Sequence, residues 1–213
     1  MISRRGVGDL IEKIAKALHD GSFDHGWQHV ERVLGWALYL AKCENIDVDE
    51  ELVKITVFLH DAGRIVGDPH AYYSSLIAEE LLRELNYSPD EIRMVTNAIL
   101  SHSYSYSRHL SLSPSENFSR LLSDADKLDA LGVVGFLRVF IYGDKHGRSL
   151  GESVEHFYEK IFKLPSLLQL DCSRRIAIWL VARTWIALTM LLEEYKAITI
   201  KPVSVNIPGE DSK

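Results

Sequence analysis

The heptapeptide FLHDAGR, residues 58–64, carries the signal from which the fold can be argued. It closes an apolar run that begins at Ile55, and it places His60 directly beside Asp61. Carboxylate oxygen suits hard divalent cations, and imidazole suits manganese, iron, cobalt, nickel and zinc. The pair therefore predicts a mixed-ligand metal site at a helix end. Alone it is weak evidence, because a solvated or helix-capping His-Asp pair would account for most random occurrences.

Two flanking stretches strengthen this interpretation. DHGWQHVERV, residues 24–33, contributes His29, and LLSDADKLDALG, residues 121–132, contributes Asp126 within an A-D-K-L-D context. The order His, then His-Asp, then Asp resembles the metal-binding signature of the HD superfamily of metal-dependent phosphohydrolases. Three further segments look like a compact bacterial and archaeal subgroup of that superfamily: AILSHSY at 98–104, RVFIYGDKHGRSL at 138–150 and HFYEKIFKLPSLL at 156–168.

The resemblance implies an all-α HD-domain helical bundle. It also implies that four side chains hold one divalent metal ion, namely His29, His60, Asp61 and Asp126. The ion is Mn, Co, Ni, Fe, Zn or Mg, because these ligands accept several metals. Whether a second metal ion binds is left open.

Three aspartates near position 126 have to be told apart. At about 100° per residue, Asp129 lies one helical turn from Asp126, whereas Asp124 points about 200° away. The family motif maps the ligand onto Asp126. Asp129 is expected to orient substrate or a ligand histidine, and Asp124 either supports the ligands or caps a helix.

Basic and histidine side chains near the expected ligands are candidates for binding phosphate. Arg32 lies one turn from His29, and a guanidinium can hold phosphate with two hydrogen bonds. Lys127 is expected to act in catalysis, and Asp61 is a candidate acceptor for the proton of water. The remaining substrate-binding candidates are Arg64, His70, His102 and Asp129. The alternative role for His70 and His102 is to bind a second metal ion. The alternative for Arg64 is an exposed arginine that takes no part in the site.

The chain also departs from some relatives. HD subgroups with a glutamate shortly after the His-Asp pair use it for acid–base work, whereas this chain reads HDAGR. A mechanism that needs this glutamate is therefore not expected here.

Composition bounds the class of protein. The 213 residues include 24 Lys+Arg and 30 Asp+Glu, for a net charge of −6, and 46% are hydrophobic. These values exclude wholesale disorder and argue against a nucleic acid polymer as partner. Cys43 and Cys172 are far apart and in no CxxC spacing, which predicts no disulfide and a reducing cytoplasm. The apolar stretch at 176–192 is interrupted by Arg183, so a buried helix is expected rather than a membrane span.

Helical periodicity runs through almost the whole chain. We expect a single HD domain over residues 1–213, with a metal-site core at about 27–134, C-terminal helices at about 151–197 and a flexible tail. Helices after the N-terminal one are predicted at 27–42, 49–62, 73–85, 89–102, 116–134, 153–162 and 173–195. The serine-rich segment 101–119 is a candidate mobile loop or lid, and the tail after Ala197 is a candidate short strand.

The sequence therefore predicts a cytoplasmic, metal-dependent phosphohydrolase that cleaves a phosphoester or phosphoanhydride bond of a small molecule. A nucleotide is the favoured class of substrate. No membrane partner is expected, and the formation of a homodimer is left open as an alternative. One alternative is a non-catalytic module that senses metal or nucleotide and acts through a partner. Another is a purely structural helical adaptor. The sequence does not name the substrate, because pocket shape and loops decide it.

Overall fold

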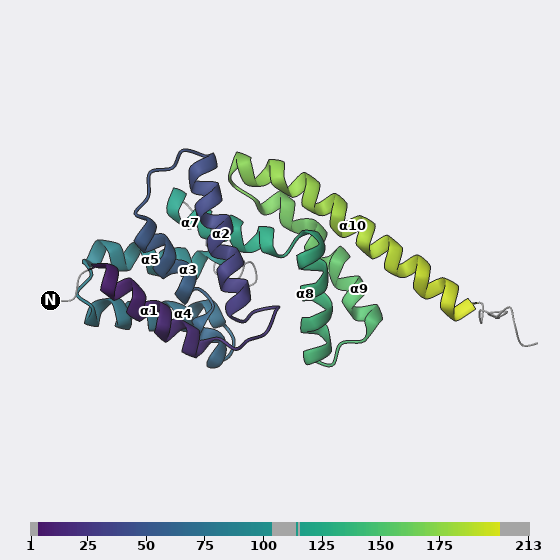
Figure 1. Ribbon diagram of the computed structural model, residues 1–213, viewed down its shortest axis with the longest axis horizontal. Helices are drawn as coiled ribbons and strands as arrows, with labels where there is room; N and C mark the ends of the chain where they lie inside the picture. The colour runs from purple at the N-terminus through teal and green to yellow at the C-terminus, as the bar shows by residue number, and fades with distance from the viewer. Residues whose placement is uncertain (1–3, 104–113, 115, 201–213) are drawn as a thin grey trace, which may run out of the picture.

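The computed structural model describes residues 4–103, 114 and 116–200, and within them it contains helices and connections but no strand (Figure 1). The expected all-α class is confirmed. The α-helices are α1 (Arg4–Leu18), α2 (Trp27–Cys43), α3 (Glu50–Leu59), α4 (His70–Glu84), α5 (Pro89–His102), α7 (Asn117–Asp129), α8 (Gly132–Lys145), α9 (Leu150–Glu159) and α10 (Asp171–Ile200). Two 3-10 helices, η1 (Ala62–Ile65) and η2 (Ile161–Leu167), follow α3 and α9.

The first six α-helices form a core in which α2, α5 and α7 pack together. Buried apolar side chains recur at three- and four-residue spacing on these helices, and the interior is filled by residues such as Val33, Leu40, Ile99, Leu121 and Leu128. Helix α5 begins as its sequence predicts, with Pro89 at its first turn and a reciprocal capping box between Ser88 and Glu91. The core fixes the ends of α3 and α5, and these ends carry the site.

Helices α8, α9 and α10 form a second part of the molecule, which joins the core through α7 (Figure 1). The prediction of one helix over 116–134 is wrong, since α7 ends at Asp129 and a separate α8 starts at Gly132. Gly132 has a φ of +71°, and a side chain at Gly135 would lie 2.1 Å from the carbonyl oxygen of Ala130. The glycines that suggested a frayed end therefore make a tight turn between two helices.

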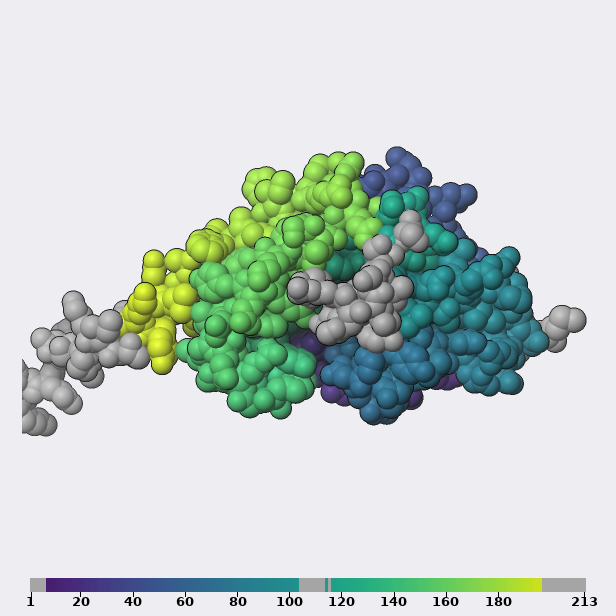
Figure 2. All heavy atoms as spheres, turned by 180° about the vertical axis from the view of Figure 1, so that it is seen from behind, coloured from purple at the N-terminus to yellow at the C-terminus, as the bar shows by residue number. Residues whose placement is uncertain are grey.

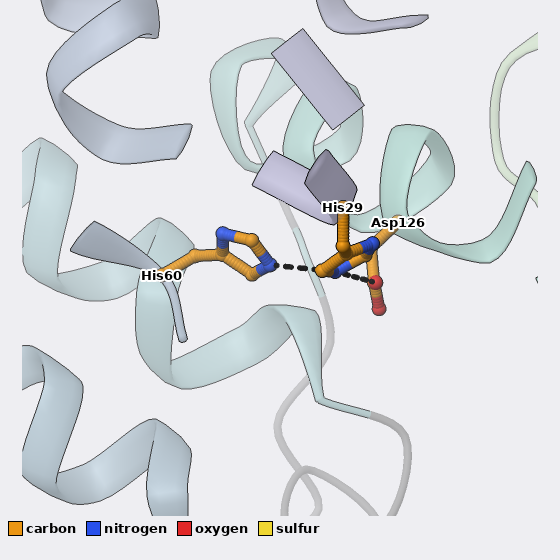
Figure 3. A group of neighbouring side chains, drawn as sticks. All are labelled: His29, His60 and Asp126. Carbon is orange, nitrogen blue, oxygen red and sulfur yellow. Dashed lines mark hydrogen bonds and ion pairs between the residues drawn. The ribbon is translucent and has the colours of Figure 1, made fainter. Parts of the chain in front are cut away.

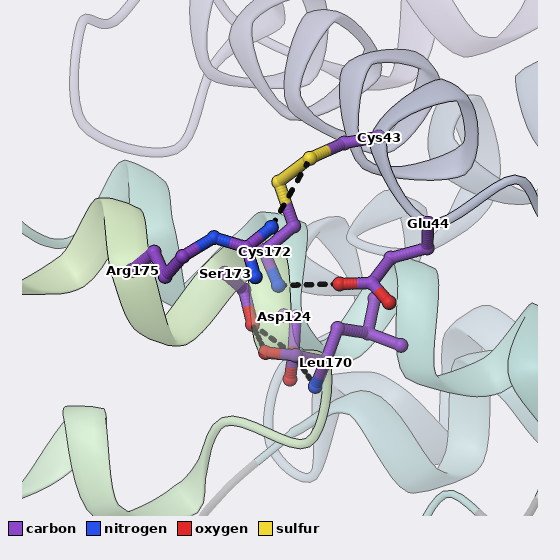
Figure 4. Close-up of a disulfide and its surroundings, with 7 residues drawn as sticks. All are labelled: Cys43, Glu44, Asp124, Leu170, Cys172, Ser173 and Arg175. Atoms are coloured by element: carbon purple, nitrogen blue, oxygen red, sulfur yellow. Dashed lines mark hydrogen bonds between the residues drawn. A yellow bond between two sulfur atoms is a disulfide. The ribbon is translucent and has the colours of Figure 1, made fainter.

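A disulfide links these two parts, contrary to the sequence-based prediction. Cys43 at the end of α2 is bonded to Cys172 at the start of α10, 129 positions later (Figure 4). Spacing along the chain did not reveal the pair, because α2 and α10 meet only through the tertiary fold. The disulfide also removes the ground on which a reducing compartment was predicted, so the cytoplasmic placement stays a prediction.

Asp124 anchors the start of α10 from within α7. Its buried carboxylate accepts hydrogen bonds from the backbone N–H groups of Gln169 and Leu170, at 2.9 and 2.8 Å, and from the hydroxyl of Ser173 at 2.5 Å (Figure 4). Of the two roles open for Asp124, the structure shows the helix-capping one. The helix that carries Asp126 is thereby fastened to α10.

Asp124→Ala is expected to lower the free energy of unfolding by about 2–3 kcal/mol, because it removes a charged acceptor from buried donors. Asp171→Ala is the matched control, since Asp171 is exposed at the same helix start and pairs with Arg174 on the surface. The control should cost less than about 1 kcal/mol. Chemical denaturation with the disulfide intact measures both, and equal losses would contradict the anchoring role.

Helix α10 is not the buried helix that its composition suggested. By length and composition Asp171–Lys196 would suffice to cross a membrane, and only 17% of its most apolar 18-residue window is buried. Large apolar side chains such as Trp179 and Ile186 are exposed on it. The helix continues through Ile200, where a strand was suggested, and the rest of that tail lies outside the described residues, as does most of the candidate lid at 101–119.

Candidate metal centre

The four ligands that the sequence predicts come together. His29 points inward from α2, His60 and Asp61 follow the last residue of α3, and Asp126 comes from α7 (Figure 3). Donor atoms of His29, His60 and Asp126 lie within 4.8 Å of one another. A second, overlapping group joins His60 and Asp61 to His102, the last residue of α5. The described residues thus offer two adjoining positions for a metal ion.

Hydrogen bonds fix the tautomers of the three histidines. The Nδ1 atoms of His60 and His102 lie 2.7 and 2.5 Å from the carbonyl oxygens of Val57 and Ile99, and these acceptors require an N–H. Nδ1 of His29 faces a carboxylate oxygen of Asp129 at 2.7 Å. A neutral imidazole that donates from Nδ1 carries a lone pair on Nε2. The lone pairs of His60 and His102 therefore point into the site, and Nε2 of His29 points there as well.

These lone pairs face other acceptors at close range. Nε2 of His29 lies 3.3 Å from Nε2 of His60 and 3.4 Å from Oδ1 of Asp126. Oδ1 of Asp61 is buried and has no hydrogen-bond partner among the described residues. Acceptors crowded together without donors suit a cation, so this donor set fits a divalent metal ion.

Burial and charge set the protonation states that such an ion needs. Burial lowers the pKa of His60 to about 4 and that of His102 to about 3, so both rings are neutral at neutral pH. Burial alone would raise the pKa values of Asp61 and Asp126, but Arg64 beside Asp61 and the histidines beside both hold them well below their usual range. Neutral imidazoles and ionised carboxylates are the metal-binding forms.

Asp129 and Arg32 bind each other. The guanidinium of Arg32 donates to both oxygens of Asp129, at 2.7 and 3.1 Å, and Arg138 donates to Oδ2 at 2.8 Å. Of the two roles open for Asp129, the structure places it behind the ligand histidine, where it orients His29. Arg32 was predicted to bind phosphate, whereas in the structure its guanidinium is paired with Asp129 behind His29. Arg138, which lies nine residues from Asp129, opens the segment RVFIYGDKHGRSL that resembles the family, but no role was predicted for it.

Arg64 and His70 lie beside Asp61. Nε of Arg64 donates to Oδ2 of Asp61 at 2.6 Å, and Nε2 of His70 lies 3.3 Å from Oδ1. A side chain at Gly63 would come within 2.4 Å of the backbone of His70 and Ser74, so glycine allows α4 to approach this closely. Both candidates thus reach the site.

Lys127 is buried and ties α7 to the end of α5. Its ammonium donates to the hydroxyl of Ser123 at 2.5 Å and to the carbonyl oxygen of His102 at 3.4 Å. Burial lowers its pKa. It also donates to the carbonyl oxygen of Ser123 at 3.1 Å, and it lines the cleft beside Asp126.

The ligands open into a cleft of about 480 Å³ between the core and the C-terminal helices. The face of the molecule where these two parts adjoin is seen in Figure 2. The far wall comes from α8, α9 and the segments that follow them, and it contributes Tyr142, Arg148, His156 and Lys160. His25, from the connection before α2, also lines the cleft, and no role was predicted for any of these five residues. Burial lowers the pKa of His25 to about 3 and that of His156 to about 4.

Arg148 and Lys160 make this wall cationic. The guanidinium of Arg148 lies over the ring of Tyr142 at 5.2 Å, and its Nη1 is buried without a hydrogen-bond partner among the described residues. Burial lowers the pKa of Lys160. Arg148 precedes α9 and Lys160 follows it, each within a segment that resembles the HD subgroup. No role was predicted for either residue, because only tertiary packing turns them toward the ligands.

Comparison with known proteins gives consistent results. The sequence model of the HD domain family matches residues 26–131. The chain is 26% identical over 168 residues to the uncharacterized protein YpgQ of Bacillus subtilis, covering 77% of this chain and 81% of YpgQ. It is 31% identical over 113 residues to an uncharacterized protein of Clostridium beijerinckii, covering 51% of this chain and 67% of that one.

Two solved structures show the same fold. The crystal structure of Bacillus subtilis YpgQ in complex with ADP superposes with a TM-score of 0.71 at 22% identity, covering 90% of this chain and 96% of that one. An HD-superfamily hydrolase from Bacillus thuringiensis superposes with a TM-score of 0.67 at 24% identity, covering 92% and 100%. The helical architecture around the site is thus shared with these proteins.

Proposed function

Because the chain belongs to the HD domain family, we propose that it is a metal-dependent phosphohydrolase that cleaves a phosphoester or phosphoanhydride bond of a nucleotide. The observation that carries the proposal is the convergence of three imidazole nitrogens and two ionised carboxylates, in two overlapping groups, on adjoining positions in a cationic cleft. The proposed ligands are His29, His60, Asp61 and Asp126, and His102 joins them where a second ion binds. When bound, the ion supplies Lewis acidity toward a phosphoryl oxygen and lowers the pKa of water.

The side chains of this chain then bind and orient the anion. Arg64 and Lys127 are the nearest cations to the ligands, and Arg148 and Lys160 face them across the cleft. Fixed positive charges aimed at a phosphoryl group stabilise the charge that develops during its transfer. Asp61, whose Oδ1 has no hydrogen-bond partner among the described residues, is the candidate acceptor for the proton of the attacking water.

Two features support a nucleotide as substrate. The cleft volume lies in the range of sites for small molecules and cofactors. YpgQ, which has the same fold, has been crystallised with ADP. A phosphate chain would lie between the ligands and Lys160, with the nucleoside toward the open side.

A release screen tests the proposed function. Phosphate and pyrophosphate are measured with nucleoside mono-, di- and triphosphates and cyclic dinucleotides, each with Mn²⁺, Co²⁺, Ni²⁺, Mg²⁺ or chelator. Metal-dependent release that is lost on chelation is expected. Nucleotide binding without release under all these metals would contradict hydrolysis and favour the sensing module that acts through a partner.

Lys160→Ala is expected to raise the KM for the active nucleotide about tenfold, because it removes one charge-assisted phosphate contact. Affinity for Mn²⁺ should be unchanged, since Lys160 is no ligand. Lys163→Ala is the matched control, being an exposed lysine three residues further on. Steady-state kinetics and calorimetric metal titration measure both variants, and an equal effect of the two would contradict a phosphate contact.

A further inference from the structure

The outward face of α10 carries a regular apolar stripe that nothing in the described chain covers. The stripe consists of Trp179, Ala182, Ile186 and Met190, all exposed, with Trp179 at 72% and Ile186 at 56%. These positions recur at three- and four-residue spacing and so lie on one side of the helix, and the exposed Arg183 lies at the edge of the stripe. In Figures 1 and 2 the C-terminal half of α10 extends beyond α8 and α9.

The opposite side of α10 is already committed to the fold. Ala177, Thr184 and Leu188 are buried there, and the hydroxyl of Thr184 accepts a hydrogen bond from the backbone N–H of Gly132 at 2.8 Å. The helix therefore has an inner side held against α8 and an outer side without a partner. A contiguous exposed apolar surface of this kind marks an interaction site.

Charges at the two ends of the stripe indicate what covers it. Arg175 continues the stripe toward the start of α10, and Glu193 continues it toward the end, at the same spacing as the apolar positions. The side chain of Arg175 lies along the disulfide, with Nη2 at 3.8 Å from Sγ of Cys43. A helix with a positive and a negative end complements an antiparallel copy of itself.

We propose that the protein forms a two-fold symmetric dimer through antiparallel pairing of this stripe with the same stripe of a second copy. With the two-fold axis crossing the stripe at the level of position 184 along the helix, Arg175 of each chain faces Glu193 of the other, so one ion pair forms at each end. The same register sets the large side chain of Ile186 against the small Ala182 and Trp179 against Thr189. Large residues facing small ones allow two helices to interdigitate.

A lipid bilayer fits the same stripe less well. A membrane span would have to detach Thr184 and Leu188 from α8, and it would carry Arg183 in its middle. A helix lying on an anionic membrane favours an all-basic border, whereas the stripe ends in Glu193 beside Glu194. The charge pattern therefore favours a second copy.

Sedimentation velocity of the full chain over a dilution series tests the dimer. The wild type is expected to dimerise, and Ile186→Glu should raise the dissociation constant about 30-fold or more, because each dimer contains the residue twice near its centre. Leu76→Glu is the control, an exposed apolar residue on α4 whose substitution should leave the constant unchanged. A wild type that stays monomeric up to about 100 µM overturns the proposal.

A charge exchange tests the register independently of folding. Arg175→Glu and Glu193→Arg should each weaken the dimer about fivefold by setting like charges together, and the double variant should restore it. Failure of the double variant to dimerise better than the single ones overturns the antiparallel pairing. Flotation with vesicles of phosphatidylcholine and phosphatidylglycerol completes the test: a monomer that binds vesicles through Ile186 overturns the proposal in favour of a membrane.

Discussion

Replacing Asp126 by alanine is expected to lower the affinity for Mn²⁺ at least about 100-fold and to reduce metal-dependent phosphate release to background. The side chain supplies one of the two ionised carboxylates of the site, and Oδ1 lies 3.4 Å from Nε2 of His29. Loss of groups that merely support a ligand already costs 10–100-fold in metal affinity, so loss of a ligand should cost no less. Calorimetric titration with Mn²⁺ and the release assay measure the two effects.

The design of this experiment separates a ligand from a structural residue. Asp68→Ala is the matched control, because Asp68 lines the same cleft but its side chain is 90% exposed. The metal-free Asp126→Ala protein should lose less than about 1 kcal/mol of unfolding free energy, since the carboxylate is partly exposed and binds no backbone donor. An Asp126→Ala variant that retains both metal and activity would refute the proposed centre.

Asp129→Ala is expected to lower the free energy of unfolding by about 3–5 kcal/mol, the largest loss of stability that we predict. It removes a buried carboxylate that binds Arg32, Arg138 and His29, and buried charges left without a partner are costly. It also frees His29 to change tautomer, so affinity for Mn²⁺ should fall about 10–100-fold. Chemical denaturation of the metal-free protein and metal titration measure the two losses.

The same residue gives a test by pH. Burial would raise the pKa of Asp129, but its bonds to His29, Arg138 and Arg32 lower it to about 2 from 3.8. A lowered folded-state pKa stabilises the fold above pH 3.8, and this contribution is lost as pH falls from there through about 2. The stability curve of Asp129→Asn should be flatter over that interval. Curves of equal slope would show that Asp129 does not make these pairs in solution.

The ligand set was predictable from the sequence because each ligand sits in a short motif of its own. FLHDAGR, QHVERV and DADKLD each identify their residues locally, and the resemblance to HD proteins supplies the order. The start of α5 was predictable for a similar reason, since its capping box lies within four consecutive residues. Local signals were sufficient where the chemistry is local.

The features that the sequence did not predict are contacts between residues on helices that lie far apart in the chain. Helical geometry correctly set Arg32 on the face of His29, but the carboxylate that it meets lies 97 residues away on α7. Arg148 and Lys160 belong to the site only because η2 and the turn before α9 face the core. The exposure of the α10 stripe could not be predicted from the sequence, because apolar residues on all sides of a helix usually indicate that the helix is buried.

The order of the helices along the chain has a consequence for how the protein is made. All proposed metal ligands lie between His29 and Asp126, whereas the far wall of the cleft comes from α8, α9 and η2, which are translated afterwards. Nascent proteins fold from the N-terminus as they leave the ribosome. The ligand set therefore emerges from the ribosome complete, ahead of the helices that narrow its entrance, and acquisition of the ion during translation can precede enclosure of the cleft.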